Sequence, residues 1–511
     1  MRNGGCDNGC AGLDRGRWEL GLANSRHEPV TAAGGLGDTR RPVVEPATEP
    51  ERDLHPVTST AAASIAIPGC RAGYTVRRRP SIRLEDALSV SSEVSELSGG
   101  LRVVTTSIPS AQSVSINIFV GAGSRGEEPR TKGLAHFLEH MMFKGTPRRP
   151  SAIQVAEAIE GAGGVLNAYT AKEMTCYWDQ VPDDRLETGI EVLADMLHNA
   201  LLAPEEIDRE RSVVQQEIKR TKDQPGAWAG ELLGRAMYGD HPMGWSTAGT
   251  EDTVAALSQA DFREWIGQWY GAPNIVVSVA GNASTDGVNA LVVRHFQNRH
   301  AAKAPVVVSV DDDIPSRRAI GEARPISQAN VALGMPALPR GDPDRYALMV
   351  LNSLLGRGMS SRLFREVRER RGLAYSVGSA VSRHSDTGML AVSAGVSPEN
   401  LREAVQVILT ELEKLTQEPV GDEELTKARD YTVGSFRLSL ETPMALGQRA
   451  GENLLTLGEI EPIDSVVGKL RLVNTEDVSR VAQRVLRRER AALSVVGPDI
   501  REDALEEMIG T

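Results

Sequence analysis

The chain has 511 residues, which is long enough for two or three domains of ordinary size. Apolar residues make up 41% of the sequence and charged residues 25%, a balance that allows sizeable buried cores. The formal net charge of −12 argues against a general nucleic-acid-binding protein. No apolar run approaches the roughly 20 residues of a membrane-spanning helix. We therefore expect neither nucleic acid nor membrane as a partner.

The first 90 residues differ in composition from the rest. They are rich in Gly, Ala, Pro, Thr and Arg, and they show no sustained hydrophobic period. No continuous apolar segment follows Met1, which argues against a secretory signal peptide, and scattered acidic residues count against a mitochondrial transit peptide. We predict that residues 1–90 are a disordered or non-native extension.

The four cysteines do not form a disulfide framework. Three of them, Cys6, Cys10 and Cys70, lie in the N-terminal extension, and only Cys176 lies in the part that we expect to fold. Such sparse cysteine usage is typical of a reducing compartment, so we expect a cytoplasmic location.

From about residue 93 onward, strand and helix patterns alternate. Strands are expected at 101–106, 114–120, 165–170, 174–181 and 275–280. Helices are expected within 131–145 and at 151–160, 186–201 and 205–221. Strands interleaved with helix pairs favour a sheet that is covered by helices on one face.

An internal repeat divides this part of the chain. Ser258–Gly281 resembles Asn474–Gly497 without a gap, and each reads as a capped amphipathic helix followed by a hydrophobic strand. We therefore predict an α+β fold of two homologous domains, each a mainly antiparallel sheet covered by helices on one face. The domains are placed at 91–305 and 306–511. A helix at 346–355 matches the helix within 131–145 but carries neither His nor Glu.

The most informative stretch is the helix within 131–145. It contains His136, Glu139 and His140, and its apolar residues recur at helical spacing. On a helix, two histidines at i and i+4 lie on the same face, and Glu139 shares that face. Two such imidazoles can hold one zinc ion while the carboxylate holds a water.

A zinc ion held by two histidines needs a third protein ligand. The best candidates lie on the predicted helix at 205–221, where Glu210 and Glu217 share a face two turns apart. Most glutamates on helices are solvated, so the spacing alone does not make either of them a ligand.

The stretch GLAHFLEHMMFKGT resembles, almost residue for residue, the pitrilysin/insulinase family of inverted-zincin metallopeptidases. The similarity is closest to the two-domain branch of bacterial processing proteases and the catalytic subunit of mitochondrial processing peptidase. In that family a helix of Arg-x-x-Val-x-x-Glu-Ile type supplies the third ligand. Arg211, Val214 and Ile218 surround Glu217 in the same pattern. The resemblance thus implies that Glu217 is a ligand and that Glu210 supports the site.

The resemblance also implies residues that handle the substrate. The stretch at 163–170 is similar to an edge strand that accepts the peptide as an added strand, with Asn167, Ala168 and Tyr169 as substrate-binding residues. Without the resemblance, the same stretch reads as a plain hairpin. Arg368 and Tyr375 match a pair that reaches the scissile carbonyl, although basic residues there also suit a helix end.

These expectations combine into one hypothesis. The chain is predicted to be a zinc metalloendopeptidase with one Zn²⁺ per chain, held by His136, His140 and Glu217. Glu139 would be the general base, and unfolded peptides would be the substrates. The resemblance also implies that the protein is a homodimer. Two alternatives stay open: a non-catalytic scaffold or partner subunit of the same fold, and the catalytic subunit of a heterodimeric mitochondrial processing peptidase.

Overall fold

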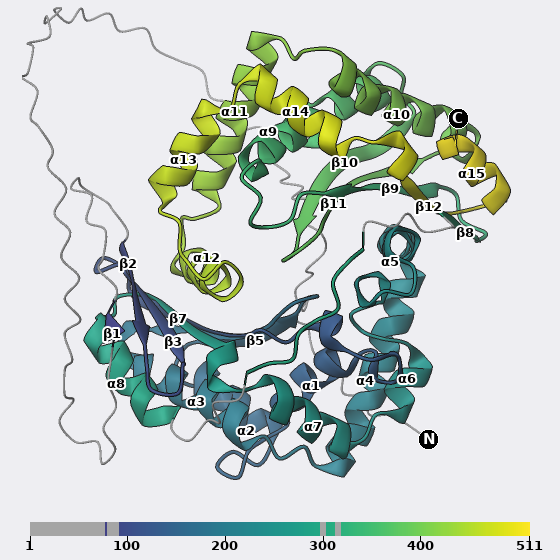
Figure 1. Cartoon of the computed structure of the whole chain (residues 1–511). Coiled ribbons are helices and arrows are strands. Elements are labelled where there is room, and N and C mark those ends of the chain that lie inside the picture. Colours follow the sequence, from purple (N-terminus) through teal and green to yellow (C-terminus); the bar gives the residue numbers. More distant parts are fainter. Residues whose placement is uncertain (1–76, 79–90, 297–302, 312–317, 511) are drawn as a thin grey trace, which may run out of the picture. The chain divides into compact units, whose positions relative to one another are not determined.

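The computed structural model describes residues 77–78, 91–296, 303–311 and 318–510 (Figure 1). They all belong to the unit 62–511. The segment 1–90, for which the sequence predicts disorder, lies outside the described residues apart from Arg77 and Arg78. None of the helices in the described part is both long and apolar enough to cross a membrane.

The first half of the chain builds a sheet with the strand order β1-β2-β3-β7-β4-β6-β5. Its strands are β1 (Arg77–Arg78), β2 (Ser91–Glu96), β3 (Arg102–Ser107), β4 (Ser113–Val120), β5 (Val165–Thr170), β6 (Thr175–Pro182) and β7 (Ile275–Gly281). Strands β3 and β7 are parallel, and the other neighbours are antiparallel. Strand β5 lies at an edge of this sheet, so one side of its backbone is open to another strand.

The helices of the first half pack against the sheet through a shared apolar core. They are α1 (Leu134–Met142), α2 (Ala152–Glu160), α3 (Leu186–Asn199), α4 (Pro204–Asp223), α6 (Glu251–Ala256), α7 (Gln259–Trp269) and α8 (Thr285–His295). Short 3₁₀ turns connect them at η1 (Ser124–Gly126), η2 (Pro129–Thr131), η3 (Asp183–Arg185), η4 (Pro242–Gly244) and η5 (Ala272–Asn274).

The second half builds a smaller sheet with the order β10-β11-β9-β12-β8. Its strands are β8 (Ala319–Ala323), β9 (Ala329–Ala337), β10 (Ala374–Arg383), β11 (Gly388–Val396) and β12 (Ala492–Gly497). Its helices are α9 (Arg345–Gly356), the π-helix η6 (Phe364–Glu369), α10 (Leu401–Gln417), α11 (Asp422–Leu438), α13 (Ile463–Leu472), α14 (Thr475–Val485) and α15 (Glu502–Gly510). Short turns lie at η7 (Pro398–Asn400) and η8 (Arg488–Arg490).

The two sheets repeat one topology. Strand β7 is parallel to β3 and antiparallel to β4, and β12 is likewise parallel to β8 and antiparallel to β9. The helix before each of these strands begins with a capping box, formed by Ser258 with Asp261 and by Asn474 with Asp477. The predicted α+β fold of two homologous, mainly antiparallel units is therefore confirmed.

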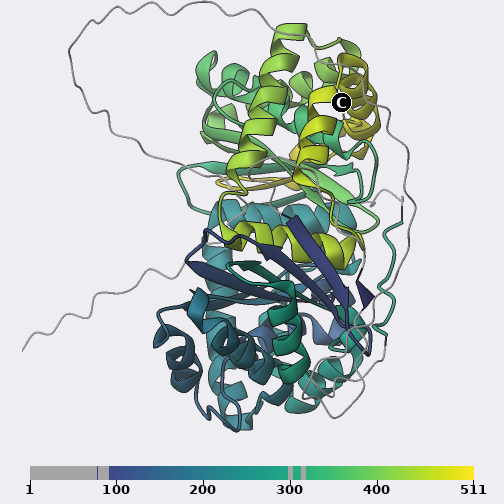
Figure 2. The same cartoon turned by 90° about the vertical axis from the view of Figure 1, so that its left-hand side faces the viewer.

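Each half also covers the second face of the other half's sheet with one helix (Figures 1 and 2). Helix α5 (Pro225–Tyr238) packs on β8, β9 and β12, and α12 (Pro443–Thr456) packs on β3, β4 and β7. The contacts are equivalent: Ser278 Oγ donates to the carbonyl of Gly447 at 2.7 Å, and Ser494 Oγ donates to the carbonyl of Ala229 at 2.6 Å. The sequence does not predict this exchange of helices.

A fully buried arginine links the β5–β6 turn to the second half. The Arg125 guanidinium donates to Glu173 at 2.7 Å and to Asp386 at 2.6 and 2.7 Å, and it also donates to the carbonyl of Val308. Glu173 lies in the β5–β6 turn, and Asp386 lies in the β10–β11 turn. Because a buried charge is tolerated only when it is paired and hydrogen-bonded, this cluster fixes the position of the β5–β6 turn.

Candidate metal centre

Helix α1 carries the His-x-x-Glu-His motif and is fixed at its start by a buried glutamate. Its first residues follow Gly133, which has φ +91° and no capping side chain of its own. Instead, Glu127 accepts hydrogen bonds from the N–H groups of Gly133 at 2.9 Å and Ala135 at 2.8 Å. A Cβ at position 133 would lie 2.5 Å from the carbonyl oxygen of Ala248, so only glycine fits. Burial raises the pKa of Glu127 to about 8, although the two N–H donors oppose this shift.

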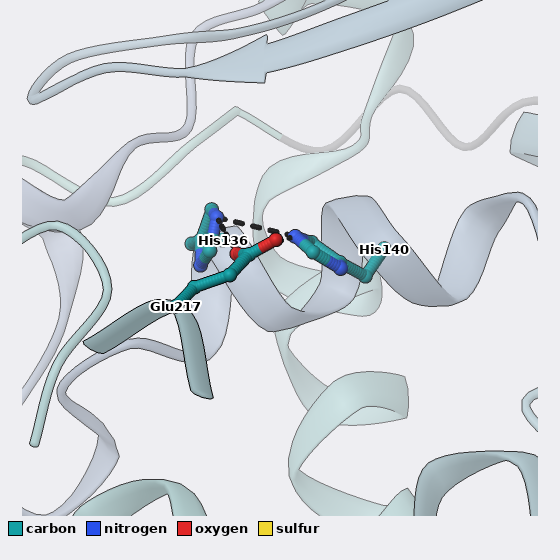
Figure 3. Close-up of side chains that lie close together, drawn as sticks. All are labelled: His136, His140 and Glu217. Atoms are coloured by element: carbon teal, nitrogen blue, oxygen red, sulfur yellow. Dashed lines mark hydrogen bonds and ion pairs between the residues drawn. The ribbon is translucent and has the colours of Figure 1, made fainter. Parts of the chain in front are cut away.

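Helices α1 and α4 bring three potential ligand atoms together (Figure 3). The Nε2 atoms of His136 and His140 are 3.2 Å apart. Oε2 of Glu217 lies 3.7 Å from His136 Nε2 and 3.5 Å from His140 Nε2. Among the described residues, this is the group of His, Cys, Asp and Glu side chains whose geometry could hold a metal ion.

The spacing of these atoms fits a zinc ion. Tetrahedral zinc with ligand distances of about 2.0–2.1 Å separates neighbouring ligand atoms by about 3.3–3.4 Å, which is close to the three observed separations. Two imidazoles and one carboxylate are also the donor set of catalytic zinc sites, which leave the fourth position open. The residues present therefore fit zinc both in geometry and in chemistry.

The second nitrogen of His140 is held by Glu210 of α4. The Nδ1 atom lies 2.9 Å from Oε1 of Glu210, and Lys144 Nζ lies 2.5 Å from the other carboxylate oxygen. Because the carboxylate accepts, Nδ1 carries the proton and the lone pair of Nε2 points toward His136 and Glu217. The side chain of Glu217, by contrast, is 44% exposed, so the centre is open to solvent on that side.

The electrostatics of the two histidines differ. Burial and, to a smaller extent, the neighbouring His140 lower the pKa of His136 to about 3, so His136 is neutral at pH 7. Burial also lowers the pKa of His140, but the hydrogen bond to Glu210 and the charges of Glu217 and Glu139 outweigh it and raise this pKa. The same negative field favours a bound cation.

Glu139 lies on the same helix as His136 and His140, but it does not belong to the group of candidate metal ligands. Burial raises the pKa of Glu139, and a hydrogen bond from Thr170 opposes that shift. The bond joins Thr170 Oγ1 to Glu139 Oε2 at 2.6 Å. A buried carboxylate beside an open ligand position is suited to act as a general base.

The residues expected to bind substrate lie on strand β5. Asn167 Oδ1 accepts a hydrogen bond from the N–H of Ala168 at 2.8 Å. Tyr169 packs against an apolar cluster that includes Phe119 and Leu454, and burial raises its pKa. Side chains alternate along a strand, so Tyr169 faces α12 whereas Thr170 faces α1.

Arg368 and Tyr375 lie in the second half and contact each other. The Arg368 guanidinium stacks between Phe364 at 4.8 Å and Tyr375 at 5.4 Å from the ring centres. Tyr375 is 77% exposed. Within the described part of the chain, neither residue forms a hydrogen bond, ion pair or ring contact with His136, His140 or Glu217. The structure thus brings together the metal candidates, Glu139 and Glu210, but not this pair.

Sequence reasoning did not predict the contacts by which three residues hold the site: Glu127, Lys144 and Thr170. Lys144 had a local signal, because it follows His140 by one helical turn and so shares its face. Glu127 and Thr170 had none, because each contacts α1 from a segment whose position depends on the tertiary fold.

Comparison with known families places this geometry in context. The model of the insulinase family, peptidase family M16, matches residues 102–251, and that of the peptidase M16 inactive domain matches residues 256–431. The chain belongs to the insulinase family. The first match contains all the metal candidates, and the second begins within the first half, before α7 and β7, and extends into the second half. The resemblance that the motifs imply is therefore confirmed.

Relatives of similar length support this membership. An uncharacterized zinc protease of Streptomyces coelicolor is 39% identical over 448 residues, covering 86% of this chain and 97% of the relative. The zinc protease YmxG of Bacillus subtilis, also uncharacterized, is 36% identical over 399 residues, covering 78% and 96%. A protease from Helicobacter pylori has the same fold, with a TM-score of 0.74, 24% identity, and coverage of 80% of this chain and all of that one.

Proposed function

We propose that the protein is a zinc-dependent endopeptidase with one zinc ion per chain. The observation that carries this proposal is the cluster of His136, His140 and Glu217, whose ligand atoms have the separations of a tetrahedral zinc site. Membership of the insulinase family, whose relatives here are named zinc proteases, supports it.

The chain's own residues account for the proton transfers. Zinc, when bound, supplies a Lewis acid that lowers the pKa of water and polarises a carbonyl group. Glu139 accepts a proton from the attacking water and then delivers it to the nitrogen of the leaving amine. Glu210 orients His140 by accepting a hydrogen bond from Nδ1. The ammonium group of Lys144 balances the negative charge of Glu210.

Strand β5 supports an extended peptide as the substrate. It is an edge strand of its sheet. The backbone N–H of Ala168 donates to Oδ1 of Asn167 in the same strand, and an added peptide strand could take over this donor. Backbone pairing at such an edge makes few demands on sequence, so we expect unfolded peptides or short extended segments as substrates.

Arg368 and Tyr375 would stabilise the oxyanion of the tetrahedral intermediate. Because they contact none of the zinc candidates of their own chain, we propose that they complete the site of a second copy in a homodimer. In a twofold-symmetric dimer the same patch serves both sites. A non-catalytic scaffold would need neither the complete ligand set nor Glu139 beside it.

Metal analysis combined with a peptidase assay tests the proposed function. We expect about one zinc per chain, cleavage of a quenched fluorogenic peptide library, loss of cleavage on chelation and recovery when Zn²⁺ is returned. A purified chain that holds no zinc and cleaves peptides with or without a chelator would contradict the proposal.

A further inference from the structure

Thr170 is the last residue of strand β5, and its side chain contacts the proposed general base. Its hydroxyl donates to Oε2 of Glu139 at 2.6 Å. A short hydrogen bond from a hydroxyl to a carboxylate is among the stronger ones in proteins. Among the described residues, the carboxylate of Glu139 accepts a hydrogen bond from Thr170 and from no other side chain, so Thr170 fixes the rotation of this carboxylate.

The backbone of Thr170 faces the open edge of the sheet. The N–H of Ala171 donates to the carbonyl of Met174 at 2.8 Å across the hairpin. Hydrogen-bonded and non-hydrogen-bonded pairs alternate along antiparallel strands, so the next pair, Thr170 with Thr175, is not hydrogen-bonded. The N–H and C=O groups of Thr170 therefore point away from β6, toward the position of an added strand.

Ala168 gives an independent indication of this orientation. It lies two residues before Thr170, so its backbone groups point the same way. Its N–H is taken by Oδ1 of Asn167, its own neighbour, instead of by β6. The open edge and the contact with Glu139 thus belong to the same strand.

The hairpin that carries Thr170 is also bound by residues that do not belong to α1. The carbonyls of Ala171 and Lys172 accept hydrogen bonds from the N–H groups of Ser124 at 3.1 Å and Arg125 at 2.8 Å. Glu173 pairs with the buried guanidinium of Arg125. The hydroxyl of Thr170 is therefore placed by the sheet and by the contacts of its hairpin with Ser124 and Arg125.

We propose that Thr170 is a positioning residue that links the substrate strand to the general base. Its backbone pairs with the bound peptide, and its hydroxyl holds the carboxylate of Glu139 toward the scissile bond. This inference rests on the proposed function and adds to it: the strand that sets the register of the peptide also aligns the group that accepts the proton. Such alignment affects turnover more than binding, because misplacement by about 1 Å can cost on the order of 100-fold in rate.

Two substitutions and one matched control test this proposal. Thr170→Val keeps the shape and removes the hydroxyl, and Thr170→Ser keeps the hydroxyl. Thr175→Val is the control. Thr175 lies in the same hairpin as Thr170, and its buried hydroxyl donates to the carbonyl of Ala122, so this substitution removes a hydroxyl that has no contact with Glu139. For each variant, zinc content, kcat, KM and the crystal structure around Glu139 are determined.

We expect Thr170→Val to lower kcat by about 10- to 100-fold, with KM within about twofold and zinc content unchanged. Thr170→Ser restores most of kcat, and Thr175→Val leaves kcat within about twofold. In the crystal, the carboxylate of Glu139 is displaced in Thr170→Val alone. Unchanged kcat in Thr170→Val, a change confined to KM, or an equal loss of kcat in Thr175→Val would overturn the proposal.

The two proposals fail in different ways. If the proposed function is wrong, the wild-type protein shows no zinc-dependent cleavage, whereas the position of the Glu139 carboxylate in Thr170→Val still tests the positioning role. A carboxylate that stays in place in that crystal structure contradicts the inference, whatever the activity.

Discussion

The Nδ1 atom of His140 lies 2.9 Å from the Oε1 atom of Glu210, seven residues before Glu217 on the same helix. One helix, α4, therefore supplies both a candidate ligand and the group that orients another. Lys144 donates to the second oxygen of Glu210. A change at Glu210 should accordingly alter metal affinity without removing a ligand atom.

Glu210→Ala is expected to weaken zinc binding by about 10- to 100-fold, because His140 loses the acceptor that fixes its tautomer and orientation. Competition with a chromogenic chelator measures the affinity. Glu206→Ala, one turn earlier on α4 and paired with Arg209 at the surface, is the matched control. Equal zinc affinity for both variants would mean that Glu210 has no supporting role.

The homodimer proposal predicts complementation between two inactive chains. If Arg368 and Tyr375 act on the partner's zinc site, a mixed dimer of Glu139→Gln and Tyr375→Phe chains has one site with both defects and one with none. The purified mixed dimer should regain up to about half of the wild-type activity. A mixed dimer no more active than its parents, or a fully active monomer, would rule out a shared site.

Glu461 is expected to make the stability of the second half depend on pH. Burial alone would raise its pKa, but hydrogen bonds from Lys469, Tyr346, Ser465 and Arg345 outweigh burial and lower this pKa to about 2. An acid whose folded pKa is depressed stabilises the fold above its unfolded pKa of about 4.5, and this stabilisation is lost as the pH falls toward 2.

Glu461→Gln should therefore lower the free energy of unfolding at pH 7, by at most about 3 kcal/mol. Urea unfolding of wild type and variant between pH 7 and pH 3 measures the difference, which should shrink below about pH 4.5. The exposed residue Glu459, changed to Gln, is the control. A difference that is constant over this pH range would show that the charge of Glu461 is not the cause.

Asp179 is expected to give the stability of the first half the opposite dependence on pH. It is fully buried on β6 beside Gly189 and Ile116, and neither carboxylate oxygen has a hydrogen-bond partner among the described residues. Burial raises the pKa of Asp179 well above its usual range. The folded chain keeps a proton there that the unfolded chain releases above about pH 4, so stability falls as the pH rises.

Asp179→Asn should be more stable than wild type at pH 8, with the gap closing as the pH is lowered toward 4. The gap grows by up to about 1.4 kcal/mol per pH unit while the folded carboxyl stays protonated. Denaturant unfolding at several pH values measures it, with the exposed Asp184→Asn as the control. Equal stability of variant and wild type at every pH would show that Asp179 has a partner in solution.

The local part of the site could be predicted from the sequence because helical spacing alone puts His136, Glu139 and His140 on one face. The partners from α4 could not, since an amphipathic pattern shows that a helix has a buried face but not which side chains meet across the contact. Glu217 therefore needed the family resemblance. Strand and helix positions, by contrast, followed the apolar periods to within a few residues.

The exchange of α5 and α12 between the halves lay beyond sequence reasoning. Both helices have an apolar face, and nothing in that pattern specifies which sheet receives it. The close approach of α12 to the first sheet becomes visible only in the structure, where a Cβ at Gly451 would lie 2.3 Å from the Phe119 ring. Thr170 escaped notice for the same reason, because its contact with Glu139 joins a strand to a helix distant in sequence.

The most direct test of the proposed activity compares wild type with Glu139→Gln. The amide keeps the shape of the side chain but cannot accept the proton, so the variant should bind as much zinc as wild type and lose at least about 100-fold in kcat on a quenched fluorogenic peptide. Zinc content and kcat are measured on the same preparations. A Glu139→Gln protein that cleaves the peptide at the wild-type rate would contradict the assignment of Glu139 and, with it, the proposed zinc peptidase mechanism.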